Sequence, residues 1–235
     1  MKRQAPERAK REWLRRIEAE YRSAAVTQHL TLWLIQIGAS PDLIQAGLRI
    51  VRDELAHAEL SHRTFVAAGG EGGPALRRDT LELHRTNEPL EHDVARVCVD
   101  VFCLGETVAV RLFKELHERC KQPVARRALD RVLRDEVRHR DFGWDLIGWM
   151  LESPSADAVH AIVVRELPSY FARIRGLYAP AGAREPTPLT NDEMAWGLMP
   201  LARYAAQVEK TFERDWVPRF AKIDVDARAA WNASG

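Results

Sequence analysis

The pattern Asp-Glu-x-x-His occurs twice in this sequence, at residues 53–57 and 135–139. A single glutamate precedes each copy at a similar distance: Glu20 lies 34 residues before the first pattern glutamate, and Glu106 lies 30 residues before the second. On an α-helix a step of three residues is close to a full turn, so the Glu and His of each copy project from one face. The repeat therefore predicts four helices that present polar side chains to a shared interior.

These residue types indicate a site for two metal ions with shared carboxylates. Four carboxylates and two imidazoles carry a formal charge that two divalent cations would balance, whereas burying them without cations would be prohibitive. Because oxygen donors dominate, we expect two Fe ions, with Mn or a mixed Mn/Fe pair as the alternative, rather than copper or zinc. The expected ligands are Glu20, Glu54, His57, Glu106, Glu136 and His139, with Glu54 and Glu136 as the bridging pair.

A third Glu-x-x-His, from Glu59 to His62, is interpreted as a chance match. About one such spacing is expected at random in a chain of this composition. Glu59 follows Glu54 by five residues, which rotates it about 140° away from the helix face that carries Glu54 and His57. It also lacks the preceding Asp, so we expect it to take no part in metal binding.

Length and charge exclude several classes of protein. A chain of 235 residues is long enough for one well-buried domain and short for two. Because 35 Lys and Arg oppose 34 Asp and Glu, a general electrostatic attraction to nucleic acid is not indicated. The sequence contains neither the apolar stretch of a secretory signal nor a membrane span of about 20 apolar residues. We therefore expect a cytoplasmic, soluble protein without a membrane partner.

The three cysteines are expected to be reduced core thiols. Cys98, Cys103 and Cys120 are odd in number and form no Cys-x-x-Cys pair, which argues against a disulfide framework, a zinc site or a rubredoxin-type iron centre. Cys103 precedes Glu106 by three residues and could therefore face the predicted site, although free cysteines commonly pack as small hydrophobes.

Helical periodicity is strong and strand alternation is nearly absent, which predicts an all-α protein. Four long helices are expected at about residues 12–37, 41–67, 91–121 and 123–151. The Gly-rich and charged segment at about 68–88 is long enough to cross from one end of a bundle to the other. The expected fold is therefore a four-helix bundle with a long crossover between helices 2 and 3.

The remainder of the chain predicts an appendage to this bundle. Two additional C-terminal helices are expected at about 156–177 and 190–215, separated by a Pro-rich loop, and residues after Pro218 are expected to form a tail. We therefore divide the chain into residues 1–151, the bundle with the metal site, and residues 152–235, a helical extension that packs on the bundle.

Over about residues 12–151 the chain resembles the ferritin-like diiron carboxylate superfamily, and within it bacterial ferritin-like domain proteins. The residues that carry the resemblance are Glu20, Asp53-Glu54-x-x-His57, Gly105-Glu106-Thr107 and Asp135-Glu136-x-Arg138-His139. The resemblance implies that Asp53 and Asp135 each hydrogen-bond the histidine of the opposite half, which fixes the ring tautomer that can bind metal. It also implies that Arg138 pairs with a neighbouring carboxylate.

The chain departs from several relatives at informative positions. Radical-type ribonucleotide reductase subunits carry a Tyr where this chain has Ser61, and multicomponent monooxygenases carry a Thr where this chain has Ala109 and Val110. Ser23 and Thr27 could place a hydroxyl near the metals, but inward hydroxyls usually donate to backbone carbonyls. No rubredoxin module is present, which disfavours a rubrerythrin. The candidate pocket residues are Ser23, Thr27, Ser61 and Cys103.

The resemblance implies an enzyme, a non-heme diiron oxidoreductase that activates O₂ to oxidise or oxygenate a small organic substrate, with an electron donor as a further partner. The C-terminal helices favour this reading because they can close a pocket over the metals, with Trp196, Tyr204, Phe212 and Trp216 as its wall or as a packing face or dimer contact. The alternative is an iron-handling protein, for ferroxidation, storage or peroxide scavenging. A homodimer is compatible with either.

Overall fold

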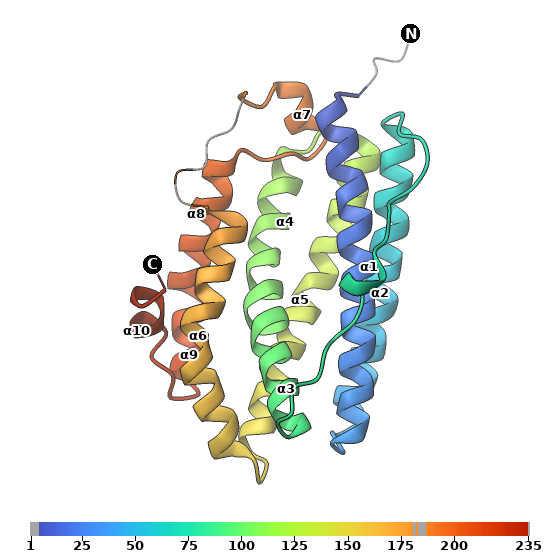
Figure 1. The fold of residues 1–235 in the computed structure, drawn as a ribbon. Coiled ribbons are helices and arrows are strands. Elements are labelled where there is room, and N and C mark those ends of the chain that lie inside the picture. The colour runs from blue at the N-terminus through green and yellow to red at the C-terminus, as the bar shows by residue number, and fades with distance from the viewer. Residues whose placement is uncertain (1–4, 181, 183–186, 235) are drawn as a thin grey trace. The chain divides into compact units, whose positions relative to one another are not determined.

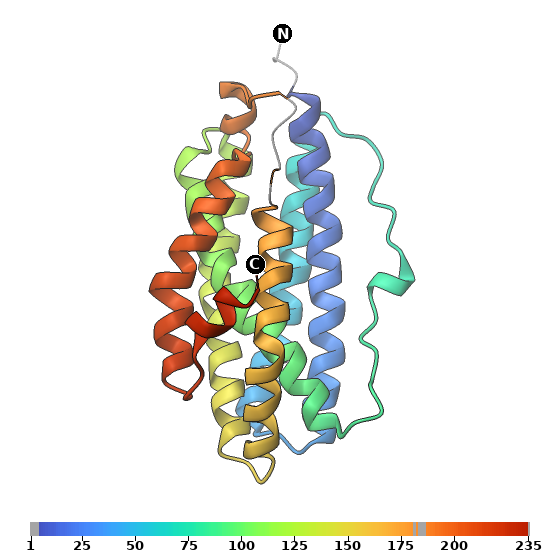
Figure 2. The ribbon, with the colours of Figure 1, turned by 60° about the vertical axis from the view of Figure 1, so that its left-hand side comes forward.

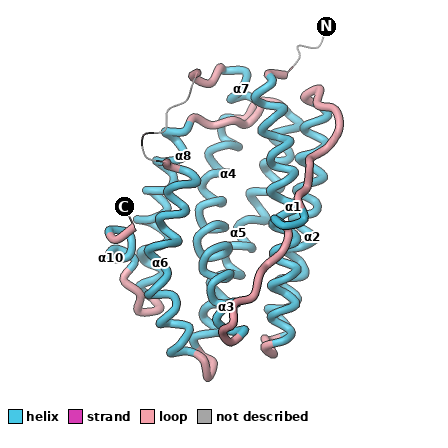
Figure 3. Tube along the Cα trace, viewed as in Figure 1, coloured by secondary structure: helices cyan, strands magenta, loops and turns pink. Residues whose placement is uncertain are grey.

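The protein is helical throughout most of the chain that this computed structural model describes, which is residues 5–180, 182 and 187–234 (Figures 1 and 3). No strand occurs among these residues, so the all-α prediction is confirmed. Contacts within the chain divide it into two compact units. Unit 1 comprises residues 1–84, 113–135 and 187–199, and unit 2 comprises residues 85–112, 136–186 and 200–235.

In unit 1, α1 (Glu7–Gln36) and α2 (Pro41–Ala67) form an antiparallel pair, seen side by side in Figures 1 and 2. Gly38 adopts a φ of 71° in the turn between them, a backbone conformation that favours glycine, and Pro41 begins α2. Gly47 allows the two helices to approach closely, because a Cβ there would lie 2.5 Å from Thr31 Oγ1. The predicted bounds of the second helix agree with α2, while α1 begins earlier than predicted.

The segment 187–199 of unit 1 contains the short helix α7 (Asn191–Ala195) and then leaves helical geometry. Trp13 of α1 donates its indole N–H to the carbonyl of Trp196 at 2.9 Å, and Arg16 donates to the carbonyl of Gly197 at 2.8 Å. Gly197 adopts a φ of 85°, and Pro200 precedes the next helix. The single helix predicted over 190–215 is therefore wrong, because a Gly turn and a Pro interrupt it.

The third long helix of the prediction is present, but its middle is a π-helix. It comprises α3 (Leu90–Val97), the π-helix η2 (Cys98–Glu106) and α4 (Thr107–Arg119). The fourth predicted helix agrees in its bounds with α5 (Pro123–Leu151). Both α4 and α5 contribute residues to each unit, with the unit boundaries after residues 112 and 135.

Unit 2 continues with α6 (Ala156–Tyr178) and the C-terminal elements. These are α8 (Leu201–Thr211), the π-helix η3 (Phe212–Trp216), α9 (Val217–Ala221) and α10 (Ala227–Asn232). The tail predicted after Pro218 therefore contains the end of α9 and the helix α10. Asp226 begins α10 by accepting hydrogen bonds from the backbone N–H groups of Arg228 and Ala229 at 3.0 Å each.

Five aromatic side chains form the core beneath these C-terminal elements. The ring of Phe171 lies 5.8 Å from Phe212, 5.6 Å from Trp216, 6.2 Å from Phe220 and 5.1 Å from Trp231, measured between centroids. Because α10 packs on α6 (Figure 2), this cluster anchors the end of the chain. Phe212 and Trp216 therefore belong to a packing face, one of the alternatives open from the sequence.

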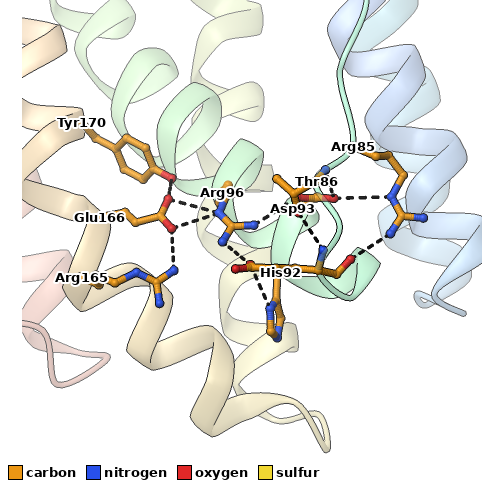
Figure 4. A network of polar contacts seen from close by, with 9 residues as sticks. Arg85, Thr86, His92, Asp93, Arg96, Arg165, Glu166 and Tyr170 are labelled. Atoms are coloured by element: carbon orange, nitrogen blue, oxygen red, sulfur yellow. Dashed lines mark hydrogen bonds and ion pairs between the residues drawn. The ribbon is translucent and has the colours of Figure 1, made fainter.

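A polar network fastens α3 to α6 within unit 2 (Figure 4). Buried Asp93 accepts hydrogen bonds from Thr86 Oγ1 at 2.8 Å and from Arg96 Nη1 at 3.1 Å. Arg96 Nε also donates to Glu166 Oε1 at 3.0 Å, and the Tyr170 hydroxyl donates to Glu166 Oε2 at 2.7 Å. Burial raises the pKa of Tyr170, and its hydrogen bond to Glu166 raises it further. The network thus ties the residues that precede α3 to the face of α6.

The sequence predicts a long connection between α2 and α3, and the connection found there also contains one short 3-10 turn, η1 (Arg78–Thr80). Within the described part of the chain, no helix combines the length and the apolar character that crossing a membrane requires.

Candidate metal centre

Unit 1 gathers three potential metal ligands in its interior. Glu20 of α1 and Glu54 and His57 of α2 are 7%, 2% and 0% exposed. One potential ligand atom from each lies within 4.8 Å of the other two. His57 Nδ1 lies 3.4 Å from Glu54 Oε2, as the three-residue helical step predicts, and 3.9 Å from Glu20 Oε2. This cluster of one imidazole and two carboxylates can hold a metal ion.

The other ring nitrogen of His57 contacts Asp135 of α5. The distance from His57 Nε2 to Asp135 Oδ2 is 3.0 Å, and the aspartate is 2% exposed. A carboxylate acceptor on Nε2 stabilises the tautomer that leaves Nδ1 available as a metal ligand. This is the type of contact that the resemblance implies for Asp135.

The charge of this cluster changes the protonation of His57. Burial acts to lower the pKa of His57, but the contacts with Asp135 and Glu54 and the charge of Glu20 outweigh it and raise the pKa to about 10. An imidazolium in place of a neutral imidazole offsets part of the negative charge of the carboxylates. A metal ion bound at Nδ1 would supply that positive charge instead and would displace the proton.

Arg131 links the two aspartates of the repeated pattern. Its Nε donates to Asp135 Oδ2 at 2.5 Å, and its Nη2 lies 3.3 Å from Asp53 Oδ1. The resemblance did not point to Arg131, which makes both of these contacts. The carboxylate pairing that it implies for Arg138, an exposed residue, stays a prediction. The sequence did contain a signal for Arg131, because it precedes Asp135 by four residues and therefore lies on the same helix face.

Unit 2 contains the counterpart of the Glu54 and His57 pair. Glu136 and His139 of α5 are 3% and 0% exposed, and His139 Nδ1 lies 3.6 Å from Glu136 Oε2. Glu106 is the last residue of η2 and is 8% exposed. Each copy of the pattern thus places its Glu and His on one buried helix face with Nδ1 directed toward the glutamate.

The four candidate pocket residues differ in their surroundings. Ser23 donates its hydroxyl to Glu54 Oε1 at 2.9 Å and so supports a predicted ligand. Thr27 and Ser61 are 0% and 1% exposed. The Cys103 thiol donates to the carbonyl of Gly143 at 3.4 Å, and burial, followed by the hydrogen bond with Cys98, raises its pKa well above the ordinary value.

The third Glu-x-x-His lies on the outside of α2. Glu59 and His62 are both exposed, and Glu59 accepts a hydrogen bond from Arg63. This agrees with the rotation expected from the five-residue step between Glu54 and Glu59. A surface pocket of about 430 Å³ in unit 1 also shares no residue with the predicted ligands, since it is lined by Glu118, Arg119, Lys121, Asn191, Met194 and Ala195.

Comparisons with protein-family models, with curated proteins and with solved structures gave no match for this chain. The case for a metal centre therefore depends on the buried carboxylates and histidines themselves. Carboxylate oxygen and imidazole nitrogen are donors that suit iron and manganese. Burying these groups together is otherwise costly, so the donor set fits a metal ion better than a role in core stability.

Proposed function

We propose that this protein is a non-heme diiron oxidoreductase built on a ferritin-like four-helix bundle. α1, α2, the helix formed by α3, η2 and α4, and α5 would supply the four helices, and residues 68–89 the crossover between the second and the third. Residues 152–235 would be the extension. The arrangement matches the general form of such bundles, in which two helices each give one Glu and two give a Glu-x-x-His pair.

The observation that carries the proposal is the buried cluster of Glu20, Glu54 and His57, in which Asp135 holds the second ring nitrogen of the histidine. Glu136 and His139 repeat the same geometry on α5. Asp135 and Glu136 are adjacent residues of α5, so this helix supplies both the aspartate that contacts His57 of the first copy and the glutamate of the second. The proposed ligands of the two ions are Glu20, Glu54, His57, Glu106, Glu136 and His139.

Two ferrous ions bound in this way can together deliver two electrons to O₂, which is the chemistry that oxidises or oxygenates an organic substrate. The chain's own groups would hold and orient the ions. Asp135 fixes the ring of His57, Ser23 donates to Glu54, and Arg131 holds Asp135 and Asp53 in place. Buried apolar side chains such as Ile50, which lies four residues before Glu54 on α2, would limit the access of water.

Metal loading provides the first test. Metal-free protein titrated with ferrous iron under anaerobic conditions is expected to bind two ions per chain, as measured by elemental analysis after removal of loosely bound iron. The double variant Glu59→Ala/His62→Ala is the matched control, because it removes an exposed Glu-x-x-His from the same helix and should load normally. Saturation at one ion or none would contradict the dinuclear proposal.

The reaction with oxygen separates the proposed function from iron handling. We expect the diferrous protein to be oxidised once on mixing with O₂ in a stopped-flow experiment and to turn over further only when a reductant and an organic substrate are supplied. The C-terminal helices support this expectation, because iron oxidation alone does not require them. Sustained oxidation of repeatedly added ferrous iron, with release or mineralisation of ferric iron, would favour the iron-handling alternative.

A further inference from the structure

Residues 98–106 of unit 2 form a π-helix that ends at Glu106, one of the proposed ligands. π-Helical geometry is rare and usually lasts a single turn, so a segment of nine residues requires support from outside the helix. The width of the turn also sets the direction of the residues at its end. The direction of the Glu106 carboxylate therefore depends on whether residues 98–106 keep π-helical geometry or relax to α-helical geometry.

Contacts from α5 show that the π-helical geometry is built into the packing. The thiols of Cys98 and Cys103 both donate to the carbonyl of Gly143, at 3.2 and 3.4 Å. These cysteines are five residues apart, and α-helical geometry would separate them by about 140° around the axis. A Cβ at Gly143 would lie 2.5 Å from Phe102 Cβ, so the absence of a side chain there allows the close approach.

The C-terminal extension contacts the same helix on both sides of Glu106. Trp216, which is fully buried, donates its indole N–H to the carbonyl of Cys103 at 3.1 Å. Its neighbour Asp215 accepts a hydrogen bond from Arg111 Nε at 2.5 Å. Both residues belong to η3, which is itself a π-helix. One turn of the extension therefore contacts Cys103, three residues before Glu106, and Arg111, five residues after it.

A second aromatic contact supports the residue that follows Glu106. Trp144 of α5 donates its indole N–H to Thr107 Oγ1 at 3.1 Å, and its ring packs edge-on against Phe220 of α9 at 5.0 Å. The extension thus reaches the neighbourhood of Glu106 both directly and through α5. Such contacts give residues 200–221 a structural role near Glu106, although the proposed ligands all precede residue 140.

We propose that Trp216 is a positioning residue for Glu106: its hydrogen bond to the Cys103 carbonyl keeps residues 98–106 in π-helical geometry and thereby fixes the direction of the Glu106 carboxylate. The assignment to a metal ligand rests on the function proposed above. The link between Trp216 and the π-helix does not, because it depends on contacts within the metal-free chain. The two statements can therefore be tested separately.

The test compares Trp216→Phe with Trp231→Phe. Both variants keep an aromatic ring in the same cluster, but only the first removes the N–H that reaches η2; the Trp231 ring instead packs on Phe171 and Phe212. Hydrogen exchange of the metal-free proteins, followed by mass spectrometry of peptides covering residues 98–107, should be about tenfold faster in Trp216→Phe than in Trp231→Phe, the order expected for one lost buried hydrogen bond. Equal exchange would overturn the inference.

Cobalt binding to the same proteins then tests the consequence for Glu106. Titration with Co²⁺ should show affinity for one of the two ions reduced roughly tenfold in Trp216→Phe and unchanged in Trp231→Phe, as for other losses of support around a ligand. Faster exchange with unchanged Co²⁺ affinity would overturn the positioning role. Wild-type protein that binds no Co²⁺ would contradict the proposed function, while the exchange comparison would still decide whether Trp216 holds the π-helix.

If Trp216→Phe does not fold, Asp215→Asn serves in its place. Asp215 is partly exposed, and the change removes its ion pair with Arg111 while leaving the aromatic cluster intact. Hydrogen exchange of residues 98–107 should again be faster and Co²⁺ affinity lower than in the wild type, each by a smaller factor than in Trp216→Phe. No change in either would overturn the proposal that the extension supports the helix around Glu106.

Discussion

The two copies of the Asp-Glu-x-x-His pattern lie in different kinds of surroundings. In unit 1, Glu20, Glu54 and His57 come from two uninterrupted α-helices; Asp135 contacts the histidine, and Arg131 in turn donates to Asp135. In unit 2, the Glu136 and His139 pair lies on an equally regular helix, but Glu106 ends a π-helix. The first half thus shows the support that charged side chains give to a histidine, and the second shows the backbone geometry that leads to a glutamate.

This difference predicts which kind of substitution should affect each half. A substitution near His57 that removes a charge but keeps the size of the side chain should change metal affinity without moving a helix. A change in packing near η2 should alter backbone geometry before it alters any ligand. The predictions below use matched substitutions in the two units to test this distinction.

The largest effect is expected from the two proposed bridging glutamates. Glu54→Ala and Glu136→Ala should each reduce saturation from two ions to at most one, because each would remove a proposed shared ligand and a quarter of the carboxylate charge of the proposed site. Elemental analysis after anaerobic loading measures this, with circular dichroism as the check on folding. Loss of loading in only one of the two variants would show that the halves are not equivalent.

Much of the fold follows from local signals in the sequence. α2 and α5 agree with their predicted bounds because each begins at a proline and keeps helical periodicity to its end. The break at Gly197 and Pro200 had a local signal that the periodicity of the flanking residues obscured. The π-helix had none, since it depends on Gly143 and Trp216, which are distant in sequence.

Some contacts of the candidate site also follow from local signals in the sequence, and others do not. The pairing of Glu54 with His57 and of Glu136 with His139 follows from a three-residue helical step, and both pairs are buried as that step requires. Arg131 could have been found from its position one turn before Asp135. The support that Trp216 gives to the helix of Glu106 could not, because a hydrogen bond between residues 113 positions apart leaves no local pattern.

The next largest effect is expected at the aspartates of the pattern. Asp135→Asn should retain the fold and weaken metal binding by roughly 10- to 100-fold, the usual cost of losing the hydrogen-bond partner of a metal-binding histidine. Competitive titration against a chelator measures the change. Asp53→Asn provides the comparison, since within unit 1 Asp53 pairs with Arg131 at 3.3 Å while Asp135 contacts both Arg131 and His57. Unchanged affinity in both variants would mean that neither aspartate orients a ligand.

Alanine substitutions at two glycines test how closely the helices pack in each unit. Gly143→Ala should lower the free energy of unfolding by about 1–3 kcal/mol, because the new methyl group would meet the Phe102 backbone at 2.8 Å. Gly47→Ala should lower it less, because the Thr31 hydroxyl can turn away at the expense of its hydrogen bond to the Thr27 carbonyl, about 1 kcal/mol, which the gain in helix propensity largely offsets. Urea denaturation of the metal-free proteins measures both.

Gly148→Ala is the control for these two glycines. It lies in α5, and a Cβ there has no heavy atom within 4 Å, so the variant should gain roughly 0.5–1 kcal/mol from helix propensity. If Gly143→Ala matched this gain, the close packing of α5 on η2 would not constrain the π-helix. The comparison between the two units would then lose its structural basis.

The smallest effect concerns Glu166, whose network in unit 2 contains none of the proposed ligands. Burial acts to raise its pKa, but hydrogen bonds from Tyr170, Arg165 and Arg96 outweigh it and hold the pKa below the ordinary value. The unfolded chain therefore binds this proton more readily, with a pKa of about 4.3. The resulting stabilisation is complete above that value and is lost as the pH falls through the pKa of the folded state.

Glu166→Gln should accordingly be less stable than the wild type at pH 7, by less than about 1 kcal/mol because the carboxylate is partly solvated. The difference should shrink as the pH is lowered below about 4.3. Urea denaturation at pH 7, 5 and 3.5 measures it, and Glu213→Gln, which alters an exposed pair with Arg228, should show no measurable change. Metal loading should remain that of the wild type. A stability difference that persists undiminished at pH 3.5 would mean that the substituted amide disturbs the packing of α3 on α6 rather than removing a charge. Altered metal loading would mean that this network influences the metal centre.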